Sequence, residues 1–227
     1  MKKYAIALVI LALAAPAFAI SPNVVISQVY GGGGSASATA TYNIDYVELY
    51  NNSAVAVSIT GWTIEYGSAT GAWGSSATNI FTFPAGAVIE PCGYVLCQFG
   101  TASAGGAALP IAADYIQTTG PAISATSGKV GLFNAVNTNL ACGLELAGTL
   151  VDKVAFGTAN CSETTAVAAL SITTGAVRNG GGTVDTDSNV SDFTVTTNPV
   201  PRNHLSATGC PVANESQTWG ALKANFR

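Results

Sequence analysis

The sequence predicts a single all-β domain built as a β-sandwich, and three observations support this fold class. Short apolar runs alternate with polar residues at the period typical of strands, whereas the helical period is nearly absent. Clusters of glycine, proline and asparagine separate these runs at a spacing typical of a sandwich. Charged residues make up only 9% of the chain and hydrophobic residues 48%, which is enough apolar material for one core. The predicted strands are Val24–Tyr30, Asp45–Tyr50, Gly61–Tyr66, Ile80–Phe83, Tyr94–Phe99, Lys129–Phe133, Leu150–Phe156, Ala176–Arg178 and Phe193–Thr196.

The first 19 residues have the character of a signal peptide. Two lysines precede an apolar run at residues 4–14, and Ala17-Phe18-Ala19 supplies the small residues of a cleavage site. The run is shorter than the ~20 residues that a membrane span needs, which favours cleavage over a membrane anchor. We therefore expect residues 20–205 to form the domain and residues 206–227 a C-terminal tail. The mature protein is expected to be secreted or at the cell surface, with no membrane span.

The charge balance disfavours nucleic acid as a partner. Without the two leader lysines, six basic residues remain against 12 acidic ones. A surface of this sign repels phosphate groups unless a basic patch or a cation compensates, and the sequence shows no such patch. The expected partner is an envelope or extracellular ligand of unknown identity.

The stretch VYGGGGSA at residues 29–36 loosely fits a dinucleotide-binding fingerprint. A phosphate cradle needs a helix behind its glycines, so that free N–H groups point at the anion. Here a threonine-rich stretch leads instead into the next predicted strand. The glycines are expected to form an excursion between two strands.

Within the strands, the alternation predicts which side chains share a face. In GWTIEYG it groups Trp62, Ile64 and Tyr66, and in IDYVELYN it separates Val47 from Glu48. Aromatic residues at this period are typical of a packed sheet face, so a core position is favoured over a platform that stacks against sugars.

Four segments within residues 24–203 form a recognisable series: VVISQVYGGGG, DYVELYNNSAVAVSITGWTIEYGSATG, LVDKVAFGTANC and VRNGGGTVDTDSNVSDFTVTTNPVPRN. Taken together and in this order, they resemble the bacterial lamin tail domain. The resemblance implies an immunoglobulin-like β-sandwich that acts as a non-catalytic interaction or architectural module. Glu48, Gly61 and Trp62 match recurrent family positions. We interpret Trp62 as a core residue and Glu48 as a sheet residue that holds neighbouring polar or backbone groups.

The segment VDTDSNVSD predicts the best candidate metal site, with Asp185, Asp187, Asn189 and Asp192 as ligands. Calcium takes six to eight oxygen ligands, and the spacing Asp-x-Asp-x-Asn resembles the start of a calcium loop. The glycine and the distal glutamate of an EF-hand are missing, so a turn in which these side chains cap their own backbone is the favoured alternative. Calcium is the only cofactor that the sequence suggests.

Residues for hydrolytic catalysis are scarce. A nucleophile needs a base beside it, and the sole histidine, His204, is expected to be an exposed linker residue. Arg178 and Arg202 are expected to support turns or to bridge to Asp185, Asp187 or Asp192. No catalytic residue is predicted, and the favoured function is adhesion, scaffolding or ligand binding in the envelope. The alternative is part of an extracellular nuclease or phosphoesterase, because bacterial copies of the domain often accompany such enzymes.

The five cysteines should enter an oxidising compartment, where pairing is expected. Cys92 and Cys97 belong to one extended run, CGYVLC, and are too far apart along a strand to pair with each other. The preferred bridge joins Cys142 to Cys161, which would attach a long loop to the strand ending near Gly157.

The tail differs in character from the domain. If it is helical, Trp219, Leu222 and Phe226 form one apolar stripe. The stripe is expected either to pack on the sandwich or to act as a recognition tag for export or attachment.

Overall fold

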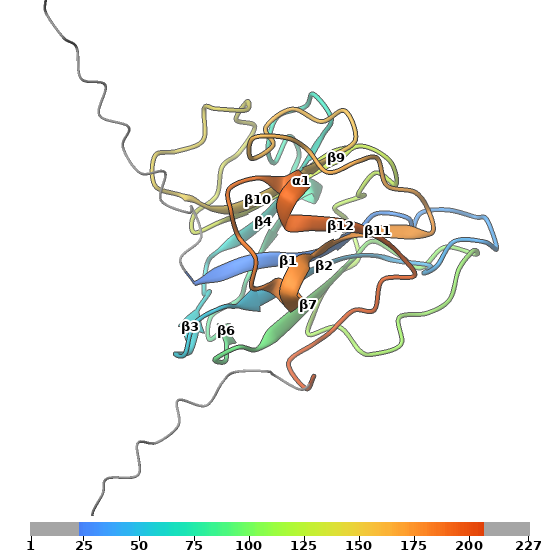
Figure 1. Cartoon of the computed structure of the whole chain (residues 1–227), viewed down its shortest axis with the longest axis horizontal. Helices are drawn as coiled ribbons and strands as arrows, with labels where there is room; N and C mark the ends of the chain where they lie inside the picture. Colours follow the sequence, from blue (N-terminus) through green and yellow to red (C-terminus); the bar gives the residue numbers. More distant parts are fainter. Residues whose placement is uncertain (1–22, 207–227) are drawn as a thin grey trace, which may run out of the picture.

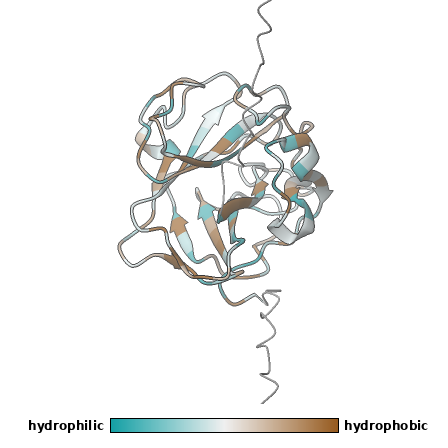
Figure 2. Ribbon diagram, turned by 60° about the vertical axis from the view of Figure 1, so that its left-hand side comes forward, coloured by the Kyte–Doolittle hydropathy of each residue, from teal (hydrophilic) through white to brown (hydrophobic). Residues whose placement is uncertain are grey.

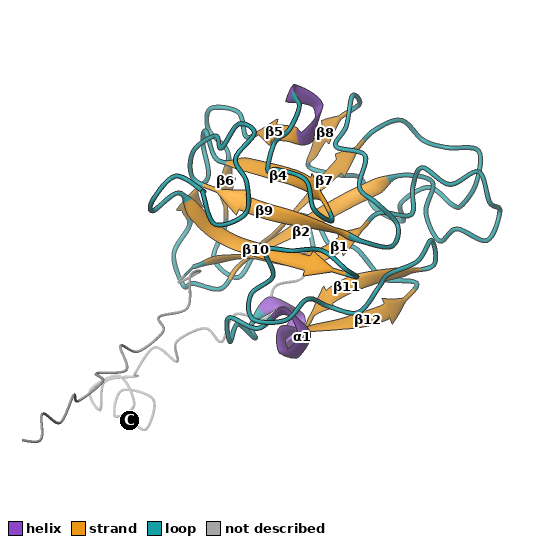
Figure 3. Cartoon of the chain, turned by 90° about the horizontal axis from the view of Figure 1, so that it is seen from above, coloured by secondary structure: helices purple, strands orange, loops and turns teal. Residues whose placement is uncertain are grey.

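The computed structural model describes residues 23–206, which form two sheets packed face to face (Figures 1 and 3). The predicted leader at residues 1–19 and the tail residues Trp219, Leu222 and Phe226 lie outside the described residues. The all-β, immunoglobulin-like prediction is confirmed, since the described chain contains only short helical turns besides its strands.

The larger sheet has six strands in the order β12-β11-β1-β2-β7-β8, and only the β7–β8 pair is parallel. The smaller sheet has four antiparallel strands in the order β10-β9-β4-β5, and β3 pairs with β6 at the side. The strands are β1 (Val24–Tyr30), β2 (Asp45–Asn51), β3 (Val57–Ser58), β4 (Thr63–Ser68), β5 (Ile80–Thr82), β6 (Val88–Ile89), β7 (Tyr94–Phe99), β8 (Tyr115–Gln117), β9 (Gly128–Phe133), β10 (Leu150–Phe156), β11 (Thr174–Arg178) and β12 (Phe193–Thr197). The helical turns are η1 (Ala77–Asn79), η2 (Asn179–Gly182) and α1 (Asn189–Asp192).

All nine predicted strands are present, with ends that shift by one or two residues. Strands β3, β6 and β8 were not predicted, and they contain only two or three residues each. So few residues carry no readable alternation. β8 forms by pairing with the longer β7, whereas β3 and β6 pair with each other.

The core between the two sheets follows the predicted alternation. Val47 and Leu49 of β2 point into it, as do Ile64 and Tyr66 of β4. The hydropathy colouring of Figure 2 shows brown segments alternating with paler or teal ones along the strands. Because side chains alternate across a strand, Glu48 must lie on the outer face of the larger sheet, where it is nevertheless fully buried.

Loops cover that outer face and explain the burial. One cluster beneath them contains Tyr30, Tyr42, Tyr46 and Leu96, and the rings of Tyr30 and Tyr46 stack with centroids 5.6 Å apart. The phenol of Tyr30 donates to the carbonyl of Ile172, which fixes a distant loop to the sheet. The central strands β1 and β2 are therefore buried on both faces, whereas the edge strands β8 and β12 are partly exposed.

The predicted core role of Trp62 is confirmed only in part. Trp62 packs against the core but is only partly buried, and it also lines an open cavity of about 300 Å³. The fully buried tryptophan is Trp73, whose indole N–H donates to Glu145 at 2.6 Å. Trp73 stands in an irregular stretch without alternation, so the sequence pattern gave no sign of its burial.

The glycine loop after β1 has a packing role. A Cβ atom on Gly33 would lie 2.0 Å from the backbone carbon of Ile44, so only glycine allows the chain to pass there. The Gly33 N–H also donates to the Asp45 carboxylate at 2.8 Å. A carboxylate in this position would repel a phosphate, which supports the predicted strand-to-strand excursion.

No helix among residues 23–206 is long and apolar enough to cross a membrane.

We predict that Gly33→Ala destabilises the protein by roughly 2 kcal/mol, because the added methyl group meets backbone atoms that cannot move aside. Gly34→Ala is the matched control, since a Cβ at Gly34 would have no atom within 4 Å. Urea unfolding of both variants measures the difference. Equal stability of the two variants would contradict the packing role of Gly33.

Candidate functional site

The most concentrated charges in the described chain surround Arg178, the last residue of β11. This side chain is fully buried and lies over the ring of Phe193 at 4.5 Å. Its Nε donates to the carbonyl of Ile26 at 2.8 Å, and its Nη1 donates to the carbonyl of Val184 at 3.1 Å. The guanidinium thus completes backbone hydrogen bonds on two segments.

Asp152 of β10 provides the main counter-charge. Its Oδ2 lies 2.7 Å from Arg178 Nη2, and both side chains are fully buried. The same oxygen accepts the N–H of Ile26 at 2.5 Å. Because β10 belongs to the smaller sheet and β11 to the larger one, this ion pair joins the two layers. Burial raises the pKa of Asp152 to about 6, although the charge of Arg178 acts in the opposite direction.

The loop before β12 brings two further carboxylates to Arg178. Asp185 Oδ1 lies 3.2 Å from Nη1 and Asp192 Oδ2 lies 3.7 Å from it. Asp192 also accepts the N–H and the hydroxyl of Thr186 and the N–H of Ser188. Asp192 therefore holds the turn together, as the turn interpretation of this segment requires.

Asn189 connects its own loop to β10 and to the segment after β10 through side-chain hydrogen bonds. Its Oδ1 accepts the N–H groups of Ala155 and Glu163, at 3.0 and 3.2 Å. Its Nδ2 donates to the carbonyl of Lys153 and to Glu163 Oε2, both at 2.9 Å. All four hydrogen-bonding positions of the amide are used, which leaves none for a metal ion.

Glu163 completes the cluster and was not predicted. It is 4% exposed, and within residues 23–206 neither its Oε1 nor Asp185 Oδ2 has a hydrogen-bond partner. Carboxylate oxygens of Glu163, Asp185 and Asp192 lie within 4.8 Å of one another. Burial, followed by the charge of Asp152, raises the pKa of Glu163 to about 9. Burial also raises the pKa of Asp185.

The structure thus separates the four predicted calcium ligands. Asp185 and Asp192 converge, whereas Asn189 is occupied by protein partners. Asp187 has a left-handed φ of 56°, and its carbonyl accepts the Thr164 hydroxyl. The predicted bridge from Arg178 to this loop is confirmed.

Arg202 does not bridge to the acidic loop; it pairs with Glu48 instead. Nη2 of Arg202 lies 2.6 Å from Glu48 Oε1, and Ser27 and Gln28 of β1 donate to the same carboxylate. Glu48 therefore holds neighbouring polar groups, as interpreted from the sequence. The guanidinium also stacks on Tyr94 at 3.9 Å, which ties the C-terminal end of the domain to the sheet.

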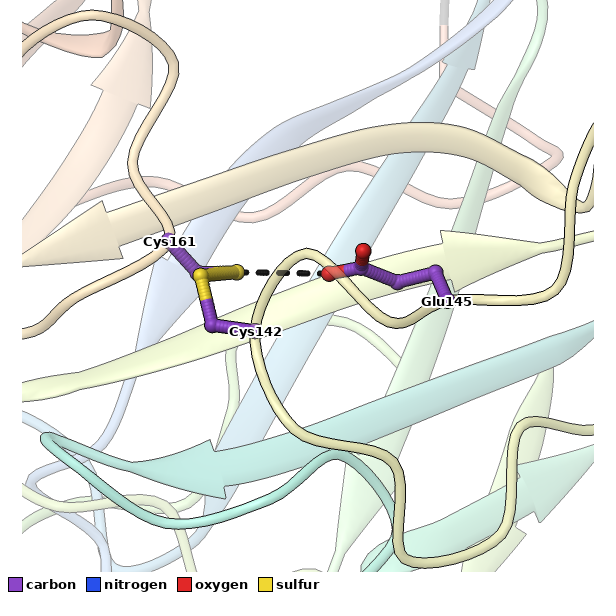
Figure 4. Close-up of side chains that lie close together, drawn as sticks. All are labelled: Cys142, Glu145 and Cys161. Carbon is purple, nitrogen blue, oxygen red and sulfur yellow. Dashed lines mark hydrogen bonds between the residues drawn. A yellow bond between two sulfur atoms is a disulfide. The ribbon is translucent and has the colours of Figure 1, made fainter.

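The predicted disulfide between Cys142 and Cys161 is present, with the Cα atoms 5.4 Å apart (Figure 4). Figure 4 shows Glu145 pointing toward the bridge, and its Oε1 lies 3.3 Å from Cys161 Sγ. The bridge attaches the loop between β9 and β10 to the segment after β10. Cys92 is also disulfide-bonded, and Cys97 is a buried free thiol, so these two do not pair with each other.

A second candidate site lies at the glycine loop. Asp45 lines a cavity of about 280 Å³ together with Thr101, Thr118 and Thr119. Burial raises the pKa of Asp45 to about 7, although the N–H groups of Gly33 and Ile123 donate to its carboxylate. A carboxyl group titrating near neutrality can exchange protons, but Asp45 is the only ionisable side chain among the described residues lining this cavity.

A third opening is a groove of about 490 Å³ near the end of the domain. We call it the His204 groove; it is lined by Val88, Glu90, Val95, Ala112, Ala113, Asp114, Tyr115, Asn203, His204 and Leu205. His204 is exposed, as predicted, but it is no free linker residue: its imidazole pairs with Asp114, and its N–H donates to the same carboxylate at 3.1 Å. Asn203 Nδ2 donates to the carbonyl of Ala112, which closes the groove at its base.

A comparison with known protein families matches residues 19–158 to the Lamin Tail Domain. The chain belongs to this family. The matched range is shorter than residues 24–203, over which the sequence segments resemble the family. A search of curated proteins finds no match. Lamin tail domains are β-sandwiches that typically serve as non-catalytic interaction modules.

Some functional residues escaped sequence reasoning because their partners are remote. Asp152 lies 26 positions from Arg178, and the neighbours of Glu163 are small or polar residues that give no sign of burial. The charged pair Asp152-Lys153 inside the otherwise apolar run LVDKVAF was the one available signal, since buried carboxylates require a partner.

We predict that Asp45 makes stability fall as the pH rises. Its pKa is raised on folding, so its favourable contribution is complete below the unfolded value near 3.8 and is lost as the pH increases through about 7. Thermal unfolding of the wild type and of Asp45→Asn between pH 5 and pH 8 measures this. The wild type should lose roughly 2–3 kcal/mol relative to the variant over this range, because the two pH units below the folded pKa each contribute about 1.4 kcal/mol. A constant difference between the two proteins would contradict the assignment.

Proposed function

We propose that the protein is an exported, non-catalytic interaction module that binds a macromolecule of the cell envelope or its surroundings through the His204 groove. The observation that supports this proposal is the volume and lining of the groove. Its volume of about 490 Å³ is in the range of ligand sites, and its lining joins apolar side chains to a few polar ones. Its framework is fixed before binding, because the Asp114 carboxylate accepts the N–H of Leu96 and Asn203 Nδ2 donates to the carbonyl of Ala112.

The groove combines apolar contact area with a few polar groups. Leu205 and Val88 are 79% and 40% exposed, while Glu90, Asp114 and His204 provide the polar atoms. Such a groove can bind an apolar side chain of a partner molecule. Hydrogen-bonding or basic groups beside that side chain would then meet the polar residues of the groove. Export is supported by the leader-like residues 1–19 and by the Cys142–Cys161 disulfide, which is typical of oxidising compartments.

An extracellular hydrolase is the second candidate, and Asp45 is the observation that favours it. Its raised pKa and its position in a cavity are typical of an acid or base catalyst. It stands without a second ionisable group among the described residues lining that cavity, so the binding module is the better supported function.

We predict that Leu205→Asp weakens binding at least tenfold without unfolding the protein, because this side chain is mostly exposed and forms a wall of the groove. The purified protein is titrated against envelope glycans, matrix proteins and DNA, and the same samples are assayed for cleavage. Leu144→Asp is the matched control, since Leu144 is 67% exposed and does not line the groove.

Binding that both variants weaken equally would contradict the groove assignment. Cleavage of any substrate that Asp45→Asn abolishes would favour the hydrolase. Absence of binding to every member of the panel would count against an envelope ligand of these classes.

A further inference from the structure

We propose that Glu163, Asp185 and Asp192 bind a calcium ion between the loop after β10 and the loop before β12. This ligand set differs from the one that the sequence spacing suggests, because Glu163 replaces Asp187 and Asn189. The site is separate from the His204 groove and does not depend on the proposed function.

The cluster around Arg178 contains more acidic than basic groups. Four carboxylates, those of Asp152, Asp185, Asp192 and Glu163, surround the single guanidinium of Arg178. These carboxylates cannot all be ionised beside one guanidinium unless a further cation replaces the protons that otherwise neutralise them. Arg178 supplies one positive charge and directs it mainly at Asp152. Lys153 acts on Glu163 only at a distance and forms no ion pair with the cluster among residues 23–206, so the carboxylates outnumber the cations around them.

Two carboxylate oxygens of the cluster form no hydrogen bond within the described residues. Glu163 Oε1 and Asp185 Oδ2 have no hydrogen-bond partner within the described residues, although Glu163 is 4% exposed and the Asp185 side chain 9% exposed. Buried polar atoms are nearly always satisfied, and an unpaired atom in a native protein indicates a missing water, proton or ion. Both atoms belong to the group whose carboxylates approach one another.

The spacing fits calcium. Two oxygens bound to one calcium ion at 2.3–2.6 Å can be at most about 5 Å apart. The ligand atoms of Glu163, Asp185 and Asp192 satisfy this limit, since all lie within 4.8 Å of one another. Magnesium binds at 2.0–2.1 Å in a stricter octahedron, so this wider and irregular group of carboxylates favours calcium.

The loops give the ion a structural role. Glu163 stands two residues after Cys161 of the disulfide, Asp185 precedes α1, and Asp192 is the last residue of α1. An ion shared by them would add a third connection to those made by Asn189 and by Arg178. Calcium binding should therefore raise the temperature of unfolding.

The test is thermal unfolding and calorimetric titration of the full mature chain with calcium chloride and with a chelator. With a dissociation constant of about 10⁻⁴ M, typical of extracellular modules, about 1 mM calcium should raise the Tm by roughly 3–5 °C. Glu163→Gln should fold in chelator as well as the wild type, since the shape is kept, and should lose at least tenfold in calcium affinity. Asp185→Asn should lose a similar factor.

Asp187→Asn is the matched control, because it removes an equal charge from the same loop and leaves the proposed ligands in place. It should keep most of the calcium-dependent shift. Equal loss in Asp187→Asn and Glu163→Gln would overturn the proposed ligand set. Absence of both heat and a Tm shift in the wild type would overturn calcium binding altogether and leave Arg178 and protons as the only positive charge in the cluster.

Discussion

The ion pair between Arg178 and Asp152 is the interaction on which the arrangement of the two sheets depends. At Ile26, β1 does not continue its pairing with β11, whose register begins at Gln28. The N–H of Ile26 bonds to Asp152 and its carbonyl to Arg178. The side chains of Asp152 and Arg178 therefore make the hydrogen bonds that a neighbouring strand would otherwise make with Ile26. They do so where β10 of the smaller sheet approaches β1. Because both are fully buried, loss of either partner leaves an uncompensated charge in the core.

Other buried charged side chains also connect distant segments of the domain. Of the 15 charged side chains in residues 23–206, eight are buried, and they hold segments together that are distant in sequence. Glu48 and Arg202 join β2 to the end of the domain, and Lys129 donates to three carbonyl or amide oxygens in neighbouring loops. Arg178 and Arg202 lie beyond the range matched to the family, so the last strands are bound to the matched part by buried charges. The surface is left with few charges, which suits recognition through apolar and neutral polar groups.

The sequence predicts the parts of this fold that depend on local pattern. Alternation located the nine longer strands, and it placed Val47 in the core and Glu48 on the opposite face. It could not show that the outer face is covered, because that depends on loops folding back over Glu48. Composition and spacing also identified the loop at residues 185–192 as polar and turn-rich. They could not show that Asn189 points back to the β10 segment, or that Glu163 joins Asp185, since these contacts arise only when the two loops meet in space.

The central claim is that Arg178 and Asp152 stabilise the sandwich as a pair, and a double-mutant cycle with Arg178→Met and Asp152→Asn tests it most directly. Urea unfolding at pH 7.5 gives the free energy of unfolding of the four proteins. Each single substitution should cost about 3–5 kcal/mol, because it leaves a buried group without its partner. The double variant should cost at least about 2 kcal/mol less than the sum of the two. Additive losses, or single losses below about 1 kcal/mol, would contradict the account.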